Sequence, residues 1–419
     1  MAARTADTPS ASVTGAAIDV YLARQPIFQR DGTLTAYELL YRGNGQDNFA
    51  VGTSADSMAS DVIVHAFLNI GVERITDGHR AFLNFTHDML VSGLHQLFTP
   101  AEVVIEMLES VEPDEEVERA CERLVAAGYT LALDDFEYHP KFDRLLTLAH
   151  IVKVDVLGKS DEQLAEIATR LSPFNVRMLA ERVETHAMQA RCASLGFELF
   201  QGYYFSKPEI LSNRDLSADE LTIIRLLNLL RDAEANDATV EDAFRADLAL
   251  SYKLLRTANS AAAGGRGIES IQHAVRLVGR RELHKWLALL LLSSVTAKGG
   301  TDRELARMAV VRARMCELLA GTRSAVGSHF IVGLFSLLDV ILRMPMAEML
   351  KRVDLAMDVQ SALLRREGPL SRPLELVEAY ERAQWPEVAT LAASLEVPPT
   401  AVQGRYVEAV AWARSVVGR

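Results

Sequence analysis

The stretch TLALDDFEYHPKFDRLLTLAHIVKVDV, residues 130–156, decides the predicted fold. It opens with a short apolar run and closes with a β-branched one, and a helix-forming segment separates the two. A strand, a helix-forming segment and a second strand in this order are typical of a parallel α/β architecture. Polar residues lie late in both runs: Asp134 and Asp135 in the first, Lys153 in the second.

The same pattern extends in both directions along the chain. Short apolar or β-branched runs occur at residues 20–28, 34–42, 81–85, 103–108, 130–136, 150–156, 176–183 and 199–205. Eight strands are enough to close a barrel. Only residues 29–33 separate the first two strands, too few for a crossover helix, so these two should form a hairpin. We therefore predict an α/β fold, a TIM-like (β/α) barrel with an antiparallel first strand.

Strand signals end near residue 210, and the rest of the chain has the pattern of helices separated by glycine- and proline-containing breaks. This predicts a second domain that is all α. The expected organisation is a flexible tail at 1–18, a barrel at 19–210, a helical domain at 211–405 and a C-terminal helix or tail at 406–419.

Charge is unevenly divided between these regions. The 419 residues have a net charge of −12, with −14 in residues 1–210 and +2 in residues 211–419. Such a balance argues against a general binder of nucleic acid backbones, so no DNA partner is expected. The amino end lacks the apolar core of a secretory signal, and no apolar run is long enough for a membrane span. We expect a cytoplasmic protein that does not bind membranes.

Polar residues recur late in the predicted strands, where a barrel gathers its catalytic groups. They are Glu38, Asn84, Glu106, Asp134, Asp135, Lys153, Glu181 and Gln201. Five clustered carboxylates need compensating cations, because like charges at short range raise one another's pKa. Oxygen ligands favour Mg²⁺ or Mn²⁺, and two adjacent aspartates suit a pair of ions. Two such ions are typical of phosphodiester hydrolysis.

These residues lie in motifs that resemble those of EAL domains, which are cyclic-di-GMP phosphodiesterases. The matching stretches, in chain order, are Gln25-Pro26-Ile27, Glu38-Leu39-Leu40 with Arg42, Asn84, Glu106 with Glu109, Asp134-Asp135-Phe136, Lys153-Val154-Asp155, Ala180-Glu181-Arg182-Val183-Glu184 and Gln201-Gly202-Tyr203-Tyr204-Phe205-Ser206-Lys207-Pro208. The seventh stretch corresponds to A-E-G-V-E and the last to Q-G-Y-x-F-x-K-P. The resemblance covers residues 20–208.

The resemblance implies a role for each position. Metal ligands would be Glu38, Asn84, Glu106, Asp134 and Asp135, holding two Mg²⁺ or Mn²⁺ ions in an active enzyme. Lys153 and Glu181 would position or activate the attacking water. Substrate would contact Gln25, Arg42, Glu184 and Gln201, with Arg42 on a phosphate, and Glu109 would support the loop. The expected ligand is cyclic-di-GMP, opened to linear pGpG.

One loop departs from the family pattern. The family sequence D-D-F-G-T-G-Y-S-S-L is replaced by DDFEYHPKFD, residues 134–143, which has neither glycine. Because Pro140 fixes its own φ and the other residues disfavour positive φ, the loop should follow a different path. In the family this loop helps to hold metals and to link barrels into dimers, so a homodimer is one expected assembly. Three hypotheses stay open: a phosphodiesterase, a receptor that no longer turns over its ligand, and a protein-interaction scaffold.

The helical region resembles HDOD domains between about 215 and 400. The resemblance rests on LLRTANSAA at 254–262, IESI at 268–271 and AVRLVG at 274–279. The related HD hydrolases need an adjacent His-Asp pair, but the comparable segment here is GLFSLLD at 333–339. This predicts a regulatory domain without chemistry of its own that contacts an unidentified protein partner.

Overall fold

The computed structural model describes residues 21–42, 71–206, 217–232, 235–261, 270–295, 301–321, 326–353 and 355–417. The predicted tail at 1–18, Lys207 and Pro208 of the closing motif, and residues 262–269 of the HDOD-like stretches lie outside these ranges.

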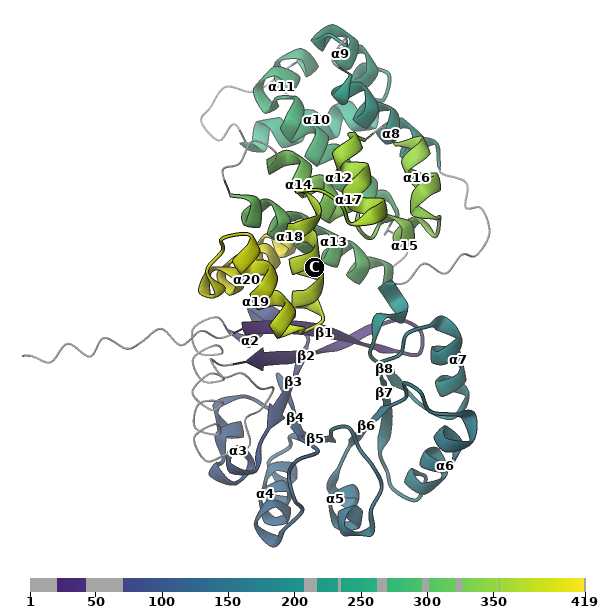
Figure 1. The fold of residues 1–419 in the computed structure, drawn as a ribbon, viewed down its shortest axis with the longest axis vertical. Coiled ribbons are helices and arrows are strands. Elements are labelled where there is room, and N and C mark those ends of the chain that lie inside the picture. The colour runs from purple at the N-terminus through teal and green to yellow at the C-terminus, as the bar shows by residue number, and fades with distance from the viewer. Residues whose placement is uncertain are drawn as a thin grey trace, which may run out of the picture.

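The amino-terminal part is a closed eight-stranded barrel whose strands follow one another in chain order (Figure 1). Its strands are β1 (Tyr21–Gln29), β2 (Leu34–Arg42), β3 (Arg80–Phe85), β4 (Val103–Met107), β5 (Thr130–Leu133), β6 (Ile151–Asp155), β7 (Arg177–Glu181) and β8 (Leu199–Phe200). Strand β1 is antiparallel to β2 and to β8, and the remaining neighbours are parallel. The predicted barrel and its antiparallel first strand are confirmed.

The last strand is shorter than predicted, because the chain turns at Gly202 and continues as the 3₁₀ helix η3 (Tyr203–Ser206). Gly202 has φ +145°, and a Cβ atom there would lie 2.2 Å from the Val183 carbonyl oxygen. Only glycine allows this close approach of two backbones. The turn therefore fixes the end of β8 beside the end of β7.

Helices that follow the strands surround the barrel: α2 (Val72–Thr76), α3 (His87–Ser92), α4 (Glu115–Ala126), α5 (Asp143–Leu148), α6 (Asp161–Leu171) and α7 (His186–Ser194). Helix α4 shows how local sequence sets their ends. The Asp114 side chain accepts hydrogen bonds from the backbone N–H groups of Glu116 and Val117, both at 2.9 Å, and the helix ends just before Gly128. The acidic first turn also favours this helix terminus.

The carboxy-terminal part is helical (Figure 1). It comprises α8 (Ala218–Arg231), α9 (Asp237–Arg245), α10 (Leu248–Ala261), α11 (Ile271–Val278), α12 (Arg280–Val295), α13 (Thr301–Ala320), α14 (Val326–Phe335), α15 (Leu338–Leu342), α16 (Met346–Arg352), α17 (Met357–Arg365), α18 (Ser371–Glu381), α19 (Trp385–Ser394) and α20 (Pro399–Val417). Helix α13 packs against α14, α18 and α20. The proposed boundary at residue 405 falls inside α20.

The helical part packs on the side of the barrel formed by β1 and β2 (Figure 1). The Tyr37 hydroxyl on β2 donates to Glu304 Oε2 on α13 at 2.7 Å. The Tyr380 hydroxyl on α18 donates to the Leu22 carbonyl at 2.9 Å, and Arg414 Nε on α20 lies 3.0 Å from Asp77 Oδ1. Both tyrosines are fully buried. The two parts therefore share a buried, hydrogen-bonded interface.

Over the residues that the structure describes, we find no helix with the length and apolar character that a membrane span requires.

Candidate active site at the mouth of the barrel

Two layers of side chains fill the middle of the barrel. Each layer has one residue from each of the eight strands or from the residues that directly follow a strand. The lower layer is apolar and buried: Ile27, Ala36, Phe82, Val104, Ala132, Ile151, Leu179 and Leu199. Side chains two residues apart on a strand point to the same side. Moving two residues toward the mouth from each member of the lower layer gives Gln25, Glu38, Asn84, Glu106, Asp134, Lys153, Glu181 and Gln201. We call these eight residues the polar ring.

The polar ring continues the strand ladders even where the formal strand has ended. The Asp134 backbone N–H donates to the Met107 carbonyl at 3.0 Å, and the Gln201 N–H donates to the Ala180 carbonyl at 2.9 Å. Both residues therefore keep the inward alternation of β5 and β8.

The Lys153 ammonium lies at the centre of the polar ring, and its side chain is only 1% exposed. Its Nζ lies 2.8 Å from Asp134 Oδ1, 2.9 Å from Glu181 Oε1 and 3.5 Å from Glu38 Oε1. It also pairs with Glu106, whose side chain is 0% exposed. One buried cation thus faces four carboxylates from four different strands.

Amide side chains link the rest of the ring to Glu38. Gln201 Nε2 donates to Glu38 Oε2 at 2.6 Å and to Gln25 Oε1 at 3.0 Å, and Asn84 Nδ2 donates to Glu38 Oε1 at 3.4 Å. These contacts hold the Glu38 carboxylate in one orientation.

Burial and charge shift the pKa values of the ring in opposite directions. Burial raises the pKa of Glu106 well above its usual range, with Asp134 and Glu38 adding to the effect against Lys153. Burial likewise raises the pKa of Glu181 to about 8. Burial alone would raise the pKa of Asp134, but Lys153 and local hydrogen bonds lower it. Burial would lower the pKa of Lys153, but the surrounding carboxylates raise it.

The charges of the ring do not balance. Four carboxylates face one ammonium, and Glu106 Oε2 is buried without a hydrogen-bond partner among the described residues. Bound protons or added cations can relieve this surplus. The oxygen donors suit Mg²⁺ or Mn²⁺ in kind. In their present positions, no three His, Cys, Asp or Glu side chains of the described part form a metal-binding group, and the Lys153 ammonium lies between the carboxylates.

Four other predicted site residues lie outside the polar ring. Asp135 is exposed with φ +38°, so it leaves the alternation of β5 and does not pair with Lys153. Glu109 and Glu184 are exposed, and Glu184 lines the cavity described below. Arg42 ends β2, and its side chain lies outside the described residues. Gln25, which the count of polar strand ends left out, completes the ring on β1.

The loop after Asp135 avoids left-handed backbone at every residue from Glu137 to Asp143. It forms a 3₁₀ turn at Pro140–Phe142, in which His139 Nδ1 accepts from the Lys141 N–H at 3.2 Å. Lys141 Nζ lies 2.6 Å from Glu112 Oε2. The substituted residues therefore adopt a path without the positive φ that glycine would permit.

Above the polar ring lies a cavity of about 790 Å³, which we call the mouth cavity. Its barrel wall includes Glu38, Glu181, Arg182, Gln201 and Tyr203, and its other wall comes from the helical part and includes Arg312, Asp339, Arg366, Glu378 and Arg382. Sequence reasoning missed these helical residues and Arg182. Arg182 replaces the glycine of the A-E-G-V-E motif, and this replacement was visible in the sequence. In the structure, Arg182 keeps a positive φ of +53°. The helical residues gave none.

Two family models match this chain. The EAL domain model matches residues 16–208, and the HDOD domain model matches residues 218–365. The matches follow one another in the order predicted from the motifs.

Two curated relatives are similar over nearly the whole length. Uncharacterized protein YuxH of Bacillus subtilis is 34% identical over 407 residues, which cover 95% of this chain and 99% of that protein. Cyclic di-GMP phosphodiesterase CdgJ of Vibrio cholerae is 34% identical over 403 residues, which cover 94% of this chain and 93% of that protein.

Solved structures with an EAL domain are similar to part of the chain. A MucR phosphodiesterase in complex with c-di-GMP is 22% identical, with a TM-score of 0.38, over 48% of this chain and 99% of that one. The Bacillus subtilis YkuI protein, in complex with c-di-GMP and calcium, is 18% identical, with a TM-score of 0.38, over 62% of this chain and 73% of that one.

Proposed function

Because the chain belongs to the family in which an EAL domain is followed by an HDOD domain, we propose that its barrel binds cyclic di-GMP and hydrolyses it to linear pGpG. The polar ring is the observation that carries this proposal. Eight polar side chains, one from each strand position, lie on a closed apolar layer and below a cavity large enough for a small ligand. Four carboxylates around a single ammonium give the ring more acidic groups than Lys153 can neutralise, which favours a role in binding cations or protons.

Divalent ions are part of the proposal. Mg²⁺ or Mn²⁺ held by Glu38, Asn84, Glu106, Asp134 and Asp135 would neutralise the phosphate and lower the pKa of a bound water. CdgJ is named a cyclic di-GMP phosphodiesterase, which supports this choice of ligand.

The chain's own residues handle the proton. Lys153 is held cationic by the carboxylates around it, so it can orient a water or a phosphate oxygen without giving up its charge. Glu181 has a pKa near neutrality because it is buried, and a group of this kind can take a proton from water and later release it. Gln25, Arg42, Glu184 and Gln201 would contact the substrate, and Glu109 would support the loop.

Turnover of cyclic di-GMP by the full-length protein tests the proposal. The protein is incubated with cyclic di-GMP and Mg²⁺ or Mn²⁺, and pGpG is followed by chromatography. We expect turnover in the wild type and a loss of at least about 100-fold in Glu38→Gln, which keeps the side-chain size but removes a charge. Glu137→Gln, an exposed carboxylate in the neighbouring loop, serves as the matched control and should retain activity.

The same experiment separates the alternatives. Binding without pGpG formation would make the barrel a receptor, a function favoured by the position of Lys153 between the carboxylates and of Asp135 outside the ring. No binding and no turnover would leave a scaffold function. For the HDOD domain we propose regulation through a protein partner, since the segment 333–339 lacks a His-Asp pair.

A further inference from the structure

The mouth cavity is built by both parts of the molecule. From the barrel, its lining includes the ring members Gln25, Glu38, Glu181 and Gln201. From the helical part come Arg312 on α13, residues after α14, Arg366 after α17 and Arg382 after α18. A ligand that reaches the polar ring through this cavity therefore lies next to helical residues.

The barrel wall of this cavity is unfavourable for an anion. It contains the carboxylates Glu38, Glu181 and Glu184 against one cation, Arg182, which is already paired with Asp155. A cyclic dinucleotide has two phosphodiester groups, each with a negative charge. Ions at the ring would compensate the phosphate that is cut. The second phosphate, which Arg42 would contact from the end of β2, would be held more tightly by a further cation on the opposite wall of the cavity.

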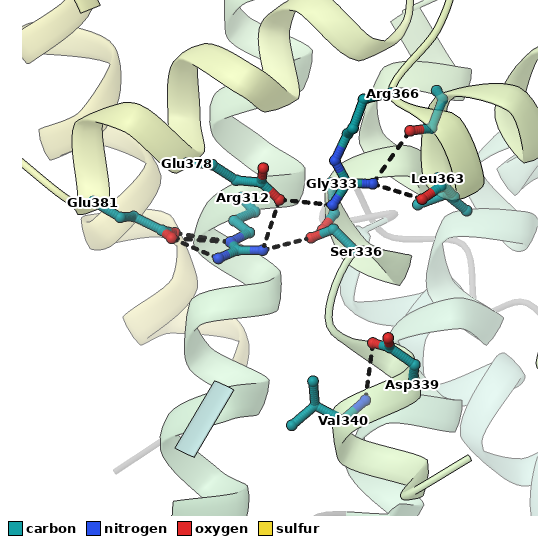
Figure 2. A network of polar contacts seen from close by, with 10 residues as sticks. Arg312, Gly333, Ser336, Asp339, Val340, Leu363, Arg366, Glu378 and Glu381 are labelled. Atoms are coloured by element: carbon teal, nitrogen blue, oxygen red, sulfur yellow. Dashed lines mark hydrogen bonds and ion pairs between the residues drawn. The ribbon is translucent and has the colours of Figure 1, made fainter. Parts of the chain in front are cut away.

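Two of the three helical arginines are committed to carboxylates (Figure 2). Arg312 is buried and pairs with Glu381 through Nη2 at 2.7 Å and through Nε at 3.0 Å, and it also donates to Ser336. Arg366 Nη2 donates to Glu378 Oε1 at 2.9 Å, and its Nη1 donates to carbonyls at the end of α17. Neither guanidinium is available without breaking these bonds.

Arg382 differs from both. It is exposed, and among the described residues no carboxylate lies within ion-pair distance of its guanidinium. Its Cζ lies 5.4 Å from the centre of the Tyr203 ring. Tyr203 lies two residues after Gln201 of the polar ring. The residue between them is Gly202, whose backbone packs closely against that of Val183. This cation–π contact, together with the side-chain hydrogen bond between Arg382 and Tyr203, holds the Arg382 charge at the cavity.

We propose that Arg382 binds a phosphate of cyclic di-GMP in the mouth cavity, so that the helical domain supplies part of the ligand site and the ligand joins both domains. This inference rests on the proposed function of the barrel. Arg366 and Arg312 position the wall, and Arg382 makes the contact. The arrangement also gives the helical domain a direct means of controlling the site, because a shift of α18 would move Arg382 away from the ligand.

Calorimetric titration of the full-length protein with cyclic di-GMP in Ca²⁺ buffer tests this proposal, with chromatography afterwards to verify that the ligand is intact. The variants are Arg382→Ala, Arg382→Lys and Arg382→Glu. Arg372→Ala is the matched control, because Arg372 lies on α18, which Arg382 directly follows, is 59% exposed, pairs with Glu375 and does not line the cavity.

Loss of a charge-assisted hydrogen bond should raise the dissociation constant by about 10- to 100-fold in Arg382→Ala. Arg382→Lys should lose less and Arg382→Glu more, and Arg372→Ala should stay within about twofold of wild type. The salt dependence of binding should be shallower in Arg382→Ala, since one ionic contact is gone. Hydrogen exchange should show ligand-dependent protection of residues 378–384 in the wild type, a readout that does not depend on any variant.

Two failures are distinguishable. If the wild type binds and Arg382→Ala binds as tightly as Arg372→Ala, with no protection of residues 378–384, the role of Arg382 is wrong and the function of the barrel stands. If the wild type does not bind cyclic di-GMP at all, both proposals are overturned.

Discussion

The two domains each bury a network of cations and carboxylates, and the networks differ in charge balance. In the barrel, Lys153 faces Glu38, Glu106, Asp134 and Glu181, so three carboxylates remain without a cation of their own. In the helical domain, Arg312 and Arg366 face Glu378 and Glu381, and no charge remains (Figure 2).

Geometry separates the networks as well. Arg312 binds Glu381 through two nitrogens of its planar fork, an arrangement that fixes both side chains. Lys153 is a point charge shared among carboxylates from separate strands. Gly333 lets the backbone of α14 approach Arg312 closely, since a Cβ there would lie 2.5 Å from the Arg312 carbonyl oxygen. The charge-balanced network around Arg312 holds helices together. The excess of carboxylates around Lys153 is typical of a site that binds cations or protons.

The largest effect is expected from Lys153→Met. Removing the ammonium leaves Glu106 buried without a counter-charge, which should lower the free energy of unfolding by about 3–5 kcal/mol in metal-free buffer at pH 8. The loss should be smaller at pH 5, because the carboxylates can then bind protons. Urea unfolding at both pH values measures it. Lys141→Met, which removes an exposed pair with Glu112, should cost less than about 1 kcal/mol. Equal losses at pH 5 and pH 8 would contradict the charge surplus.

Arg312→Met should cost about 3 kcal/mol, because Glu381 loses its buried partner. The double variant Arg312→Met/Glu381→Leu should recover most of this loss, since a balanced pair can be replaced by apolar side chains. Chemical unfolding of the wild type, both single variants and the double variant gives the coupling energy. A double variant less stable than Arg312→Met alone would show that the network is more than a matched pair.

The partly buried His284 provides a test of how the stability of the helical domain depends on acid pH. Burial lowers the pKa of His284 to about 4, and the nearby charge that acts on it, that of Arg231, adds to the effect. A histidine whose folded pKa lies below its unfolded value of about 6.5 contributes stability that is lost as the pH falls from 6.5 to 4. The loss should be at most about 3 kcal/mol.

The Glu181 carboxyl gives the opposite slope. Its folded pKa of about 8 lies above its unfolded value, so its contribution to stability is lost as the pH rises toward 8.

Unfolding of the wild type and of His284→Asn between pH 4 and pH 7 tests the prediction for His284, with His139→Asn, an exposed loop histidine, as control. An unchanged slope in His284→Asn would rule out its part in acid sensitivity.

The smallest effect is expected at the interface between the domains. Tyr37→Phe removes the hydroxyl that donates to Glu304 at 2.7 Å and should cost about 1 kcal/mol. Thermal unfolding measures the change. Tyr138→Phe, whose hydroxyl bonds Asp143 near the surface at 3.1 Å, should change stability less. A larger loss in Tyr138→Phe would mean that the interface bond contributes little.

Much of the barrel could be read from the chain. Strand alternation has a period of two, so an apolar residue such as Ala132 or Leu179 fixes the inward direction of Asp134 or Glu181 two positions later. This predicted nearly the whole polar ring. The alternation does not extend to Asp135, because adjacent residues on a strand cannot both point inward, and the φ of +38° at Asp135 ends it. The search for polar residues late in each strand did not include Gln25. Because β1 runs antiparallel to its neighbours, its inward polar residue, Gln25, comes before its apolar one, Ile27.

The sequence by itself determined the order of strands and helices, the family and the inward polar positions, because these depend on local periodicity and on motifs. Only the tertiary structure decided that Lys153 gathers four carboxylates and that Arg312, Arg366 and Arg382 reach the mouth of the barrel. Contacts between residues far apart in the chain, such as Tyr37 and Glu304, leave no periodic signal. The contacts of Lys153 arise from closure of the barrel, and those of the arginines from the packing of the helical domain on β1 and β2, where Tyr37 and Tyr380 are buried.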